Sequence, residues 1–267
     1  MEQSTQEPII AAPNTPSSIE ARYASSQLSW WPVLLFLPAR LIYSLLSQAL
    51  TAGLFAILGS ANPWWDATGW WPVYSTITDV LCLVSLVWLT RREGLGLADL
   101  IGVRSRSDLK QLAWTPAYLL AAAPAAALAS LITQYFYGSA LPPMISVVHL
   151  PLAGALYSLL VWPIIWVIAE ELGYLGYLLP RVQALSGRTW VAALVVTFFW
   201  GLQHLAIPYI ADGTYLLSRV LAAWAATGGI TLVYVLWRRR LIAMIGAHYV
   251  FDLATGFLVG ILPWLSR

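Results

Sequence analysis

The stretch VIAEELGYLGYLLPR, residues 167–181, decides how the chain is interpreted. It follows residues 151–169, which carry no charge, and it places Glu170 and Glu171 side by side before the apolar run resumes as LGYLGYLL. Charged side chains inside an apolar segment are costly and are kept where they have a partner or a function. The two carboxylates therefore predict a functional region within a membrane helix.

Composition places the whole chain in a membrane. Of its 267 residues 60% are hydrophobic and 10% are charged, and the mean hydropathy is +0.72. Soluble domains carry roughly 25% charged residues, so we expect an integral membrane protein in contact with lipids. The formal net charge of +2 gives no indication of nucleic-acid binding. The single cysteine, Cys82, excludes an intrachain disulfide and a CxxC metal pair.

The apolar segments predict an all-α polytopic membrane protein. Residues 1–29, rich in Ser, Pro and Gln, predict a disordered cytoplasmic tail, and residues 30–267 a single transmembrane domain. About seven transmembrane helices are expected, or eight if the basic segment 91–111 contributes an interfacial helix. The predicted spans are 33–59, 70–90, 112–137, 151–179, 189–210, 216–237 and 242–262.

Lysine and arginine alternate between the predicted loops. They occur in 91–111, 181–188 and 238–240, whereas 60–69, 138–150 and 211–215 contain none. The positive-inside rule then predicts a cytoplasmic amino terminus and a carboxyl terminus outside.

Few ionisable residues lie well inside the predicted spans, and each is a functional hypothesis. They are Asp79, Glu170, Glu171, His204, His248 and Asp252. For Asp79 we expect a structural partnership with Arg40, because no motif surrounds it.

Helical spacing groups these side chains. His248 and Asp252 are four residues apart and share a helix face, as do Trp200 and His204. Adjacent residues on a helix point about 100° apart, so Glu170 and Glu171 cannot have the same role. Tyr174 shares the face of Glu170.

Depth then suggests that the polar residues meet. At 1.5 Å per residue, Glu170, His204, His248 and Asp252 all lie about 10–20 Å from the cytoplasmic ends of their spans. We therefore expect one buried cluster formed by three helices.

The residue types leave several uses of this cluster open. One is a hydrolytic site, in which a water lies between Glu170 and His204, and His248 with Asp252 stabilises an oxyanion. Others are ligation of zinc, or of haem by His204 and His248. A proton relay and structural polar contacts between helices are further alternatives.

Three motifs, in order, resemble those of a known family. The residues EELGYLGYLLP from Glu170 onwards resemble EExxxR, WGLQHLAIP at 200–208 resembles FxxxH, and HYVFD at 248–252 resembles Hxxx(N/D). Over about residues 85–260 the chain thus resembles the CPBP family. This family comprises CAAX-protease and bacteriocin-processing (Abi-type) intramembrane proteases, including type II CAAX prenyl endopeptidase-like proteins.

The resemblance implies a helical bundle with a cavity that reaches into the bilayer. It also implies endopeptidase chemistry on a peptide or lipid-modified protein substrate. In that chemistry Glu170 activates the water, His204 helps to hold it, and His248 with Asp252 stabilises the oxyanion.

Supporting roles are expected for Glu171, Trp200 and Tyr174. The resemblance implies no required cofactor, while zinc held by the same two histidines and by Glu170 and Asp252 stays open. The expected location is a bacterial inner membrane.

One motif position departs from the family. Leu175 stands where EExxxR has its arginine, so Glu171 lacks that partner, and Arg181, Arg219 and Arg40 are the candidates to replace it. This departure supports an alternative function, in which the protein is a catalytically weakened member that acts as a binding or accessory subunit of a membrane complex.

Overall fold

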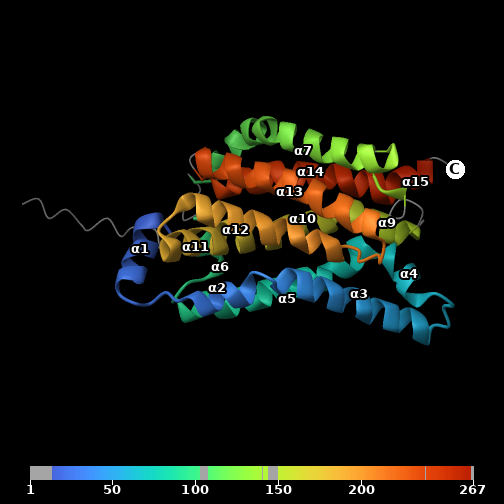
Figure 1. Ribbon diagram of the computed structural model, residues 1–267, viewed down its shortest axis with the longest axis horizontal. Coiled ribbons are helices and arrows are strands. Elements are labelled where there is room, and N and C mark those ends of the chain that lie inside the picture. The colour runs from blue at the N-terminus through green and yellow to red at the C-terminus, as the bar shows by residue number, and fades with distance from the viewer. Residues whose placement is uncertain (1–13, 103–107, 140, 144–149, 238, 266–267) are drawn as a thin grey trace, which may run out of the picture.

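The computed structural model describes residues 14–102, 108–139, 141–143, 150–237 and 239–265. All regular secondary structure in these ranges is helical. Most helices run along the long axis of the molecule, with α7 at one edge, α3 and α5 at the opposite edge, and α10, α12, α13 and α14 between them (Figure 1). The α-helices are α1 (Pro16–Ala24), α2 (Trp30–Phe36), α3 (Ala39–Ile57), α4 (Pro63–Thr68), α5 (Trp71–Arg92), α6 (Leu97–Ile101), α7 (Thr115–Tyr137), α9 (Leu152–Leu160), α10 (Trp162–Glu171), α11 (Leu179–Ser186), α12 (Thr189–Leu202), α13 (Gly213–Leu236), α14 (Leu241–Gly256) and α15 (Leu262–Leu265).

The chain has the helices of an integral membrane protein. Among the described residues six helical segments are long and apolar enough to span a membrane, and a bent pair makes up to seven. This confirms the predicted all-α polytopic fold. The six are Trp30–Ile57, Trp71–Arg92, Asp108–Tyr137, Thr189–Ala206, Gly213–Leu236 and Leu241–Ile261, and the pair is Leu152–Leu160 with Trp162–Ser186.

The bent pair contains the glutamates. The pair bends by 40° at Val161, next to the start of α10, because Pro163 has no backbone N–H to continue the helix from α9. After Glu171 the chain continues without interruption as a π-helical segment, Leu172–Leu178, and then as α11. Glu170 therefore lies inside a continuous helical stretch, two residues before the hydrogen-bonding pattern widens.

The predicted disordered tail is wrong for Pro16–Ala24, which form α1, while residues 1–13 lie outside the described part of the chain. Thr15 caps α1 by accepting a hydrogen bond from the Ser18 backbone, and Pro16 occupies its first turn, as is favourable at a helix start. Ile19 is buried where α1 packs against α11. A local cap and one buried apolar contact thus outweigh the polar composition of the segment.

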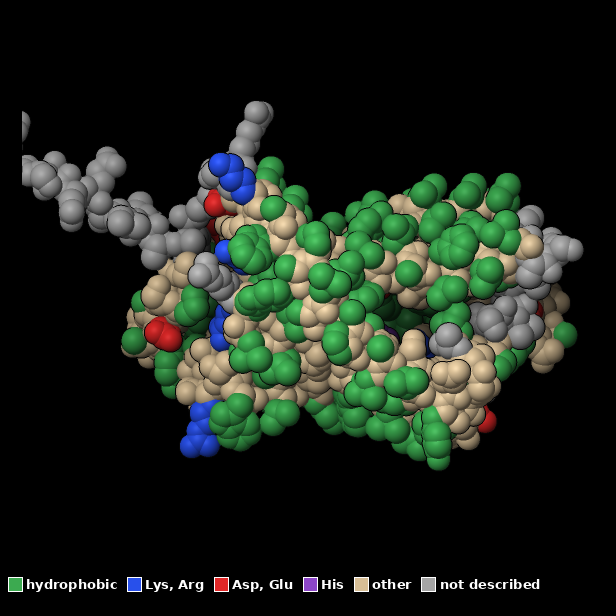
Figure 2. Space-filling model, turned by 90° about the horizontal axis from the view of Figure 1, so that it is seen from above, with side chains coloured by type: hydrophobic (Ala, Val, Ile, Leu, Met, Phe, Trp, Pro, Cys, Tyr) green, Lys and Arg blue, Asp and Glu red, His purple; other side chains and the backbone are tan. Residues whose placement is uncertain are grey.

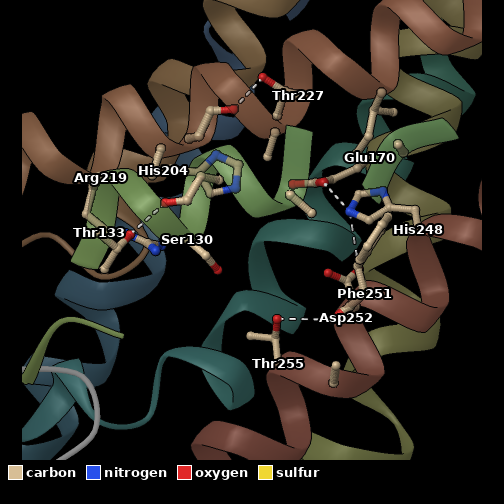
Figure 3. Close-up of a pocket in the computed structure, with 18 of the residues that line it drawn as sticks. Ser130, Thr133, Glu170, His204, Arg219, Thr227, His248, Phe251, Asp252 and Thr255 are labelled. Atoms are coloured by element: carbon tan, nitrogen blue, oxygen red, sulfur yellow. Dashed lines mark hydrogen bonds and ion pairs between the residues drawn. The ribbon is translucent and has the colours of Figure 1, made fainter. Parts of the chain in front are cut away.

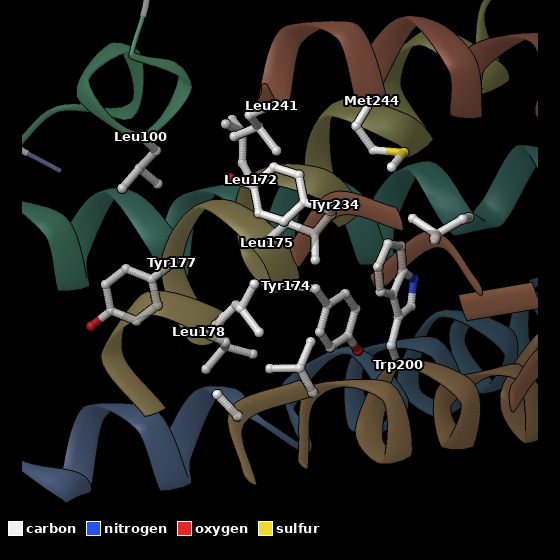
Figure 4. Packing of buried hydrophobic residues seen from close by; sticks show 14 of the residues in the cluster. Leu100, Leu172, Tyr174, Leu175, Tyr177, Leu178, Trp200, Tyr234, Leu241 and Met244 are labelled. Atoms are coloured by element: carbon white, nitrogen blue, oxygen red, sulfur yellow. The ribbon is translucent and has the colours of Figure 1, made fainter. Parts of the chain in front are cut away.

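A packed apolar cluster surrounds the π-helical segment (Figure 4). It contains Tyr174, Leu175 and Leu178 from that segment, with Trp200 from α12 and Met244 from α14. This cluster lies in the half of the molecule next to α1 and packs around the helix that carries Glu170 and Glu171.

Close helix contact at the other end depends on two glycines. A Cβ added at Gly256 would lie 2.3 Å from the carbonyl oxygen of Ser158 in α9, and one at Gly260 would lie 2.9 Å from that of Ala155. Their spacing is that of the GxxxG pattern, which lets two membrane helices approach backbone to backbone. The end of α14 is thereby held against α9.

Candidate active site

Glu170 is buried and surrounded by donors. Its Oε2 accepts a hydrogen bond of 3.0 Å from the indole of Trp200, and its Oε1 accepts one from the side-chain amide of Gln203. The guanidinium of Arg40, in α3, lies 3.4 Å from Oε1 and 2.6 Å from the carboxylate of Asp79 in α5. The Arg40–Asp79 pair predicted from the sequence is therefore confirmed, and it also contacts Glu170.

Helix α12 ends where it supplies these donors. Beyond Leu202 the chain tightens into a short 3₁₀ turn, Gln203–Ala206, and this brings Gln203 and Trp200 to the same carboxylate. Behind them, Tyr174 stacks on Trp200 with ring centroids 5.0 Å apart and donates a 3.0 Å hydrogen bond to the Gln203 oxygen. Trp200 and Tyr174 thus lie where supporting residues were expected, and they hold the orientation of the donors to Glu170.

His204 presents its other nitrogen to open space. Its Nδ1 lies 3.0 Å from the carbonyl oxygen of Trp200, which can only accept, so Nδ1 carries the proton. In the neutral imidazole Nε2 is then the acceptor. His204 lines a cavity together with Glu170, so an acceptor nitrogen and a carboxylate border the same space.

His248 lies between the two glutamates. Its Nδ1 is 2.9 Å from Glu171, and its Nε2 is 3.5 Å from Asp252 and 3.7 Å from Glu170. The expected pairing of His248 with Asp252 on one helix face is present. Glu170 and Glu171, the last two residues of α10, lie near the same imidazole.

Glu171 finds its partner in this histidine and not in an arginine. Arg181 pairs with Glu93 at 2.6 Å, and Arg219 donates to the Ile207 carbonyl at 2.8 Å, so neither of these candidates takes the place of the motif arginine. Glu171 is fully buried, and its Oε2 has no hydrogen-bond partner in the described part of the chain. The position of Leu175 thus leaves one carboxylate oxygen unpaired.

A cavity of about 350 Å³ joins these groups. Glu170, His204, Arg219, His248 and Asp252 all line it, and its walls come from α7, α13 and α14. The labelled polar side chains converge on this space from several helices (Figure 3). On the face above α7 the surface is hollowed among hydrophobic side chains, and a basic side chain is visible at the bottom of the hollow (Figure 2).

The walls of the cavity leave room because their side chains are small. Helix α7 lines it with residues such as Ala122, Ala126 and Ala129, and α13 with Ala222 and Ala226. Short side chains on both helices leave unfilled volume opposite the acids and imidazoles of the site.

Two residues in the site were not predicted to act there. Gln203 is uncharged, and its position matches none of the helical spacings that grouped the other polar residues. Only its place next to His204 in an apolar run could have indicated a role. Arg219 was noted as a candidate cation for Glu171, yet it lies in the cavity wall without contacting that residue through any ion pair among the described residues.

The zinc and haem alternatives rested on the same side chains. Within the described ranges, no group of three or more His, Cys, Asp or Glu side chains is arranged to hold a metal ion.

Comparison with known families identifies the region that contains these motifs. Residues 152–254 match the family model described as type II CAAX prenyl endopeptidase Rce1-like. No curated protein and no solved structure matches the chain. The matched region runs from α9 to α14 and contains both glutamates, both histidines and Asp252. The chain is therefore a polytopic membrane protein whose residues 152–254 resemble the Rce1-like type II CAAX prenyl endopeptidases, in agreement with the resemblance of the three motifs.

Proposed function

We propose that the protein is an intramembrane endopeptidase in which Glu170 is the general base. The observation that carries the proposal is that Glu170, His204, His248 and Asp252 line one cavity. A carboxylate and an imidazole acceptor at the edge of the same space can hold a water molecule between them. The substrate would be a peptide, or the end of a lipid-modified chain, that enters from the membrane.

The reaction follows from these positions. Water adds its oxygen to the carbonyl carbon of the peptide bond while its proton passes to Glu170, with His204 Nε2 accepting the second hydrogen bond of the water. The carbon–nitrogen bond then breaks, and the proton on Glu170 passes to the leaving amine. The products are a carboxylic acid and an amine, and transfer of the remaining acid proton to the amine gives a carboxylate and an ammonium group, so atoms and charges balance.

The developing oxyanion requires donors. His248, with Nδ1 directed at Glu171, offers an Nε2–H to the cavity in its doubly protonated form, and Asp252 at 3.5 Å orients that nitrogen. Glu171 is thus proposed to position His248. Trp200, Gln203 and Arg40 fix the Glu170 carboxylate before substrate arrives, and pre-orientation of this kind lowers the barrier.

The proposed topology places the amino terminus in the cytoplasm and the carboxyl terminus outside. Helices α1 and α15 lie at opposite ends of the molecule, as this topology requires (Figure 1). The end with α1 also carries Arg91 and Arg92 at the close of α5 and Arg239 and Arg240 before α14, and a basic end favours the cytoplasmic side.

The test is peptide cleavage by the full chain in proteoliposomes. We expect Glu170→Gln and His204→Gln each to lower the rate by about 10²–10⁴-fold, the usual contribution of general acid–base catalysis. Glu20→Gln, in an exposed position of α1, is the matched control and should match the unaltered protein. Parallel reactions with chelator and with added zinc report whether a metal takes part.

A library of membrane-anchored and prenylated peptides serves as the substrate pool. Absence of cleavage by a folded protein that captures the same membrane partner with and without Glu170→Gln would overturn the protease proposal. It would favour the accessory-subunit function, which the unpaired Glu171 oxygen opposite Leu175 supports.

A further inference from the structure

A second pocket adjoins the cavity. It has a volume of about 140 Å³ and shares His204, Arg219, His248, Asp252 and Thr255 with the cavity wall. Its remaining lining is largely aromatic, from the beginnings of α5 and α10. The pocket therefore extends the site toward the end of the molecule opposite α1.

Three N–H groups of this pocket have no partner. They are the indole Nε1 of Trp71, the indole Nε1 of Trp162 and the guanidinium Nε of Arg219, all buried and without a hydrogen bond among the described residues. Trp71 is 4% exposed and Trp162 is 2% exposed. Buried N–H groups are nearly always hydrogen-bonded, and leaving them unpaired is costly. Three such groups around one pocket therefore point to a missing acceptor.

The character of the three groups defines that acceptor. Indole and guanidinium nitrogens only donate, and Arg219 is permanently positive. No ion pair joins Arg219 to an acid in the described part of the chain, and one of its other nitrogens donates to the Ile207 carbonyl. Asp252 also lines the pocket; its Oδ2 lies 3.5 Å from His248 Nε2, which makes it the counter-charge of that histidine, and this oxygen accepts no hydrogen bond among the described residues. A group with two acceptor oxygens and a negative charge satisfies all three donors.

We propose that this pocket binds the terminal carboxylate of the peptide substrate. Arg219 would pair with the carboxylate, and the indoles of Trp71 and Trp162 would donate to its oxygens. The proposal rests on the proposed function, because the residues shared with the cavity place the chain end on the leaving side of the scissile bond. Trp71 packs edge to face against Trp162 and Trp166, with Trp71 and Trp162 centroids 4.9 Å apart, so the donors are held by rigid rings.

The experiment compares two peptides that differ only in their last group, a free carboxylate or a carboxamide. With the unaltered full chain in proteoliposomes we expect kcat/KM to be at least about tenfold higher for the carboxylate, since a hydrogen-bonded charge is lost in the amide. Arg219→Gln and the double variant Trp71→Phe with Trp162→Phe should each bring that ratio toward one. Arg188→Gln and Trp190→Phe, at exposed positions of the opposite end, are the matched controls and should keep the ratio.

Binding separates this proposal from the proposed chemistry. Fluorescent forms of the two peptides are titrated onto Glu170→Gln protein, in which the proposed base is absent. A carboxylate preference that disappears with Arg219→Gln supports the subsite even if no peptide is ever cleaved. A ratio near one in the unaltered protein, or a preference that survives both the arginine and the tryptophan variants, overturns it.

Discussion

The two halves of the molecule treat buried groups differently. Around the π-helical segment Leu172–Leu178, apolar side chains pack against one another and the buried cation Arg181 pairs with Glu93 at 2.6 Å. Around the cavity, small side chains leave about 350 Å³ open, and Arg219 and two tryptophans keep unpartnered donors. One buried arginine is thus paired with an acid, whereas the other has no acid partner among the described residues and lies where a ligand can enter. Substitutions in each half test this difference.

The largest effect is expected from Arg40→Gln, because the guanidinium of Arg40 contacts the buried carboxylates of both Asp79 and Glu170.

 Without the guanidinium, two buried carboxylates lose their shared cation, and removing one partner of a buried ion pair costs about 3–5 kcal/mol. Unfolding in mixed detergent micelles measures this loss. Arg188→Gln, at an exposed position, should change the free energy of unfolding by less than about 0.5 kcal/mol. Equal stability of the two variants would contradict the role given to Arg40.

Gly256→Ala tests the close helix contact near the cavity. The added methyl group would lie 2.3 Å from a backbone oxygen of α9, which cannot rotate away, so we expect a loss of about 1–3 kcal/mol. Gly53→Ala in α3 is the control, because an added Cβ there meets nothing within 4 Å. That control should be neutral or slightly stabilising, since alanine favours a helix over glycine. The same unfolding measurement compares the two, and a stable Gly256→Ala protein would argue against the contact.

Trp200→Phe tests the donors to Glu170. The phenyl ring can keep the stack on Tyr174, but the carboxylate loses its indole N–H. We expect a loss of about 1–2 kcal/mol in stability, because a buried acceptor is left with one donor fewer, together with a lower kcat. Trp190→Phe, on the exposed surface of α12, should leave both quantities as they were. Unchanged turnover by Trp200→Phe would show that this hydrogen bond does not orient the base.

The smallest effect concerns the missing motif arginine. Leu175→Arg and Leu178→Arg each bury a cation in the packed half, but residue 175 is one turn from the unpaired Oε2 of Glu171 and lines a cavity of about 560 Å³. We expect Leu175→Arg to be the less destabilising variant. A double-mutant cycle with Glu171→Gln should give a coupling of about 1 kcal/mol for Leu175→Arg and none for Leu178→Arg. Equal coupling at both positions would remove Glu171 as the partner of the family arginine.

The sequence predicted the parts of the structure that depend on hydropathy and helical spacing. The spans follow from apolar length, and the common depth of Glu170, His204 and His248 anticipated that they border one cavity. Other features depend on three-dimensional neighbours. Gln203 reaches Glu170 only because α12 tightens at its end, and nothing in the sequence signals that turn. The partner of Glu171 was unpredictable for the same reason, since His248 comes from a distant helix.

The widened turn after Glu171 has a consequence for comparing sequences. A π-helical turn accommodates one residue more than an α-helical turn, and one residue rotates everything that follows by about 100°. Glu170 faces the cavity and Arg181 contacts Glu93 and Asn14, so both orientations depend on that added residue. Deleting one position within 172–178 would keep one of these orientations and lose the other. The number of residues between Glu170 and Arg181 is therefore a stricter signature of this architecture than the EExxxR pattern itself.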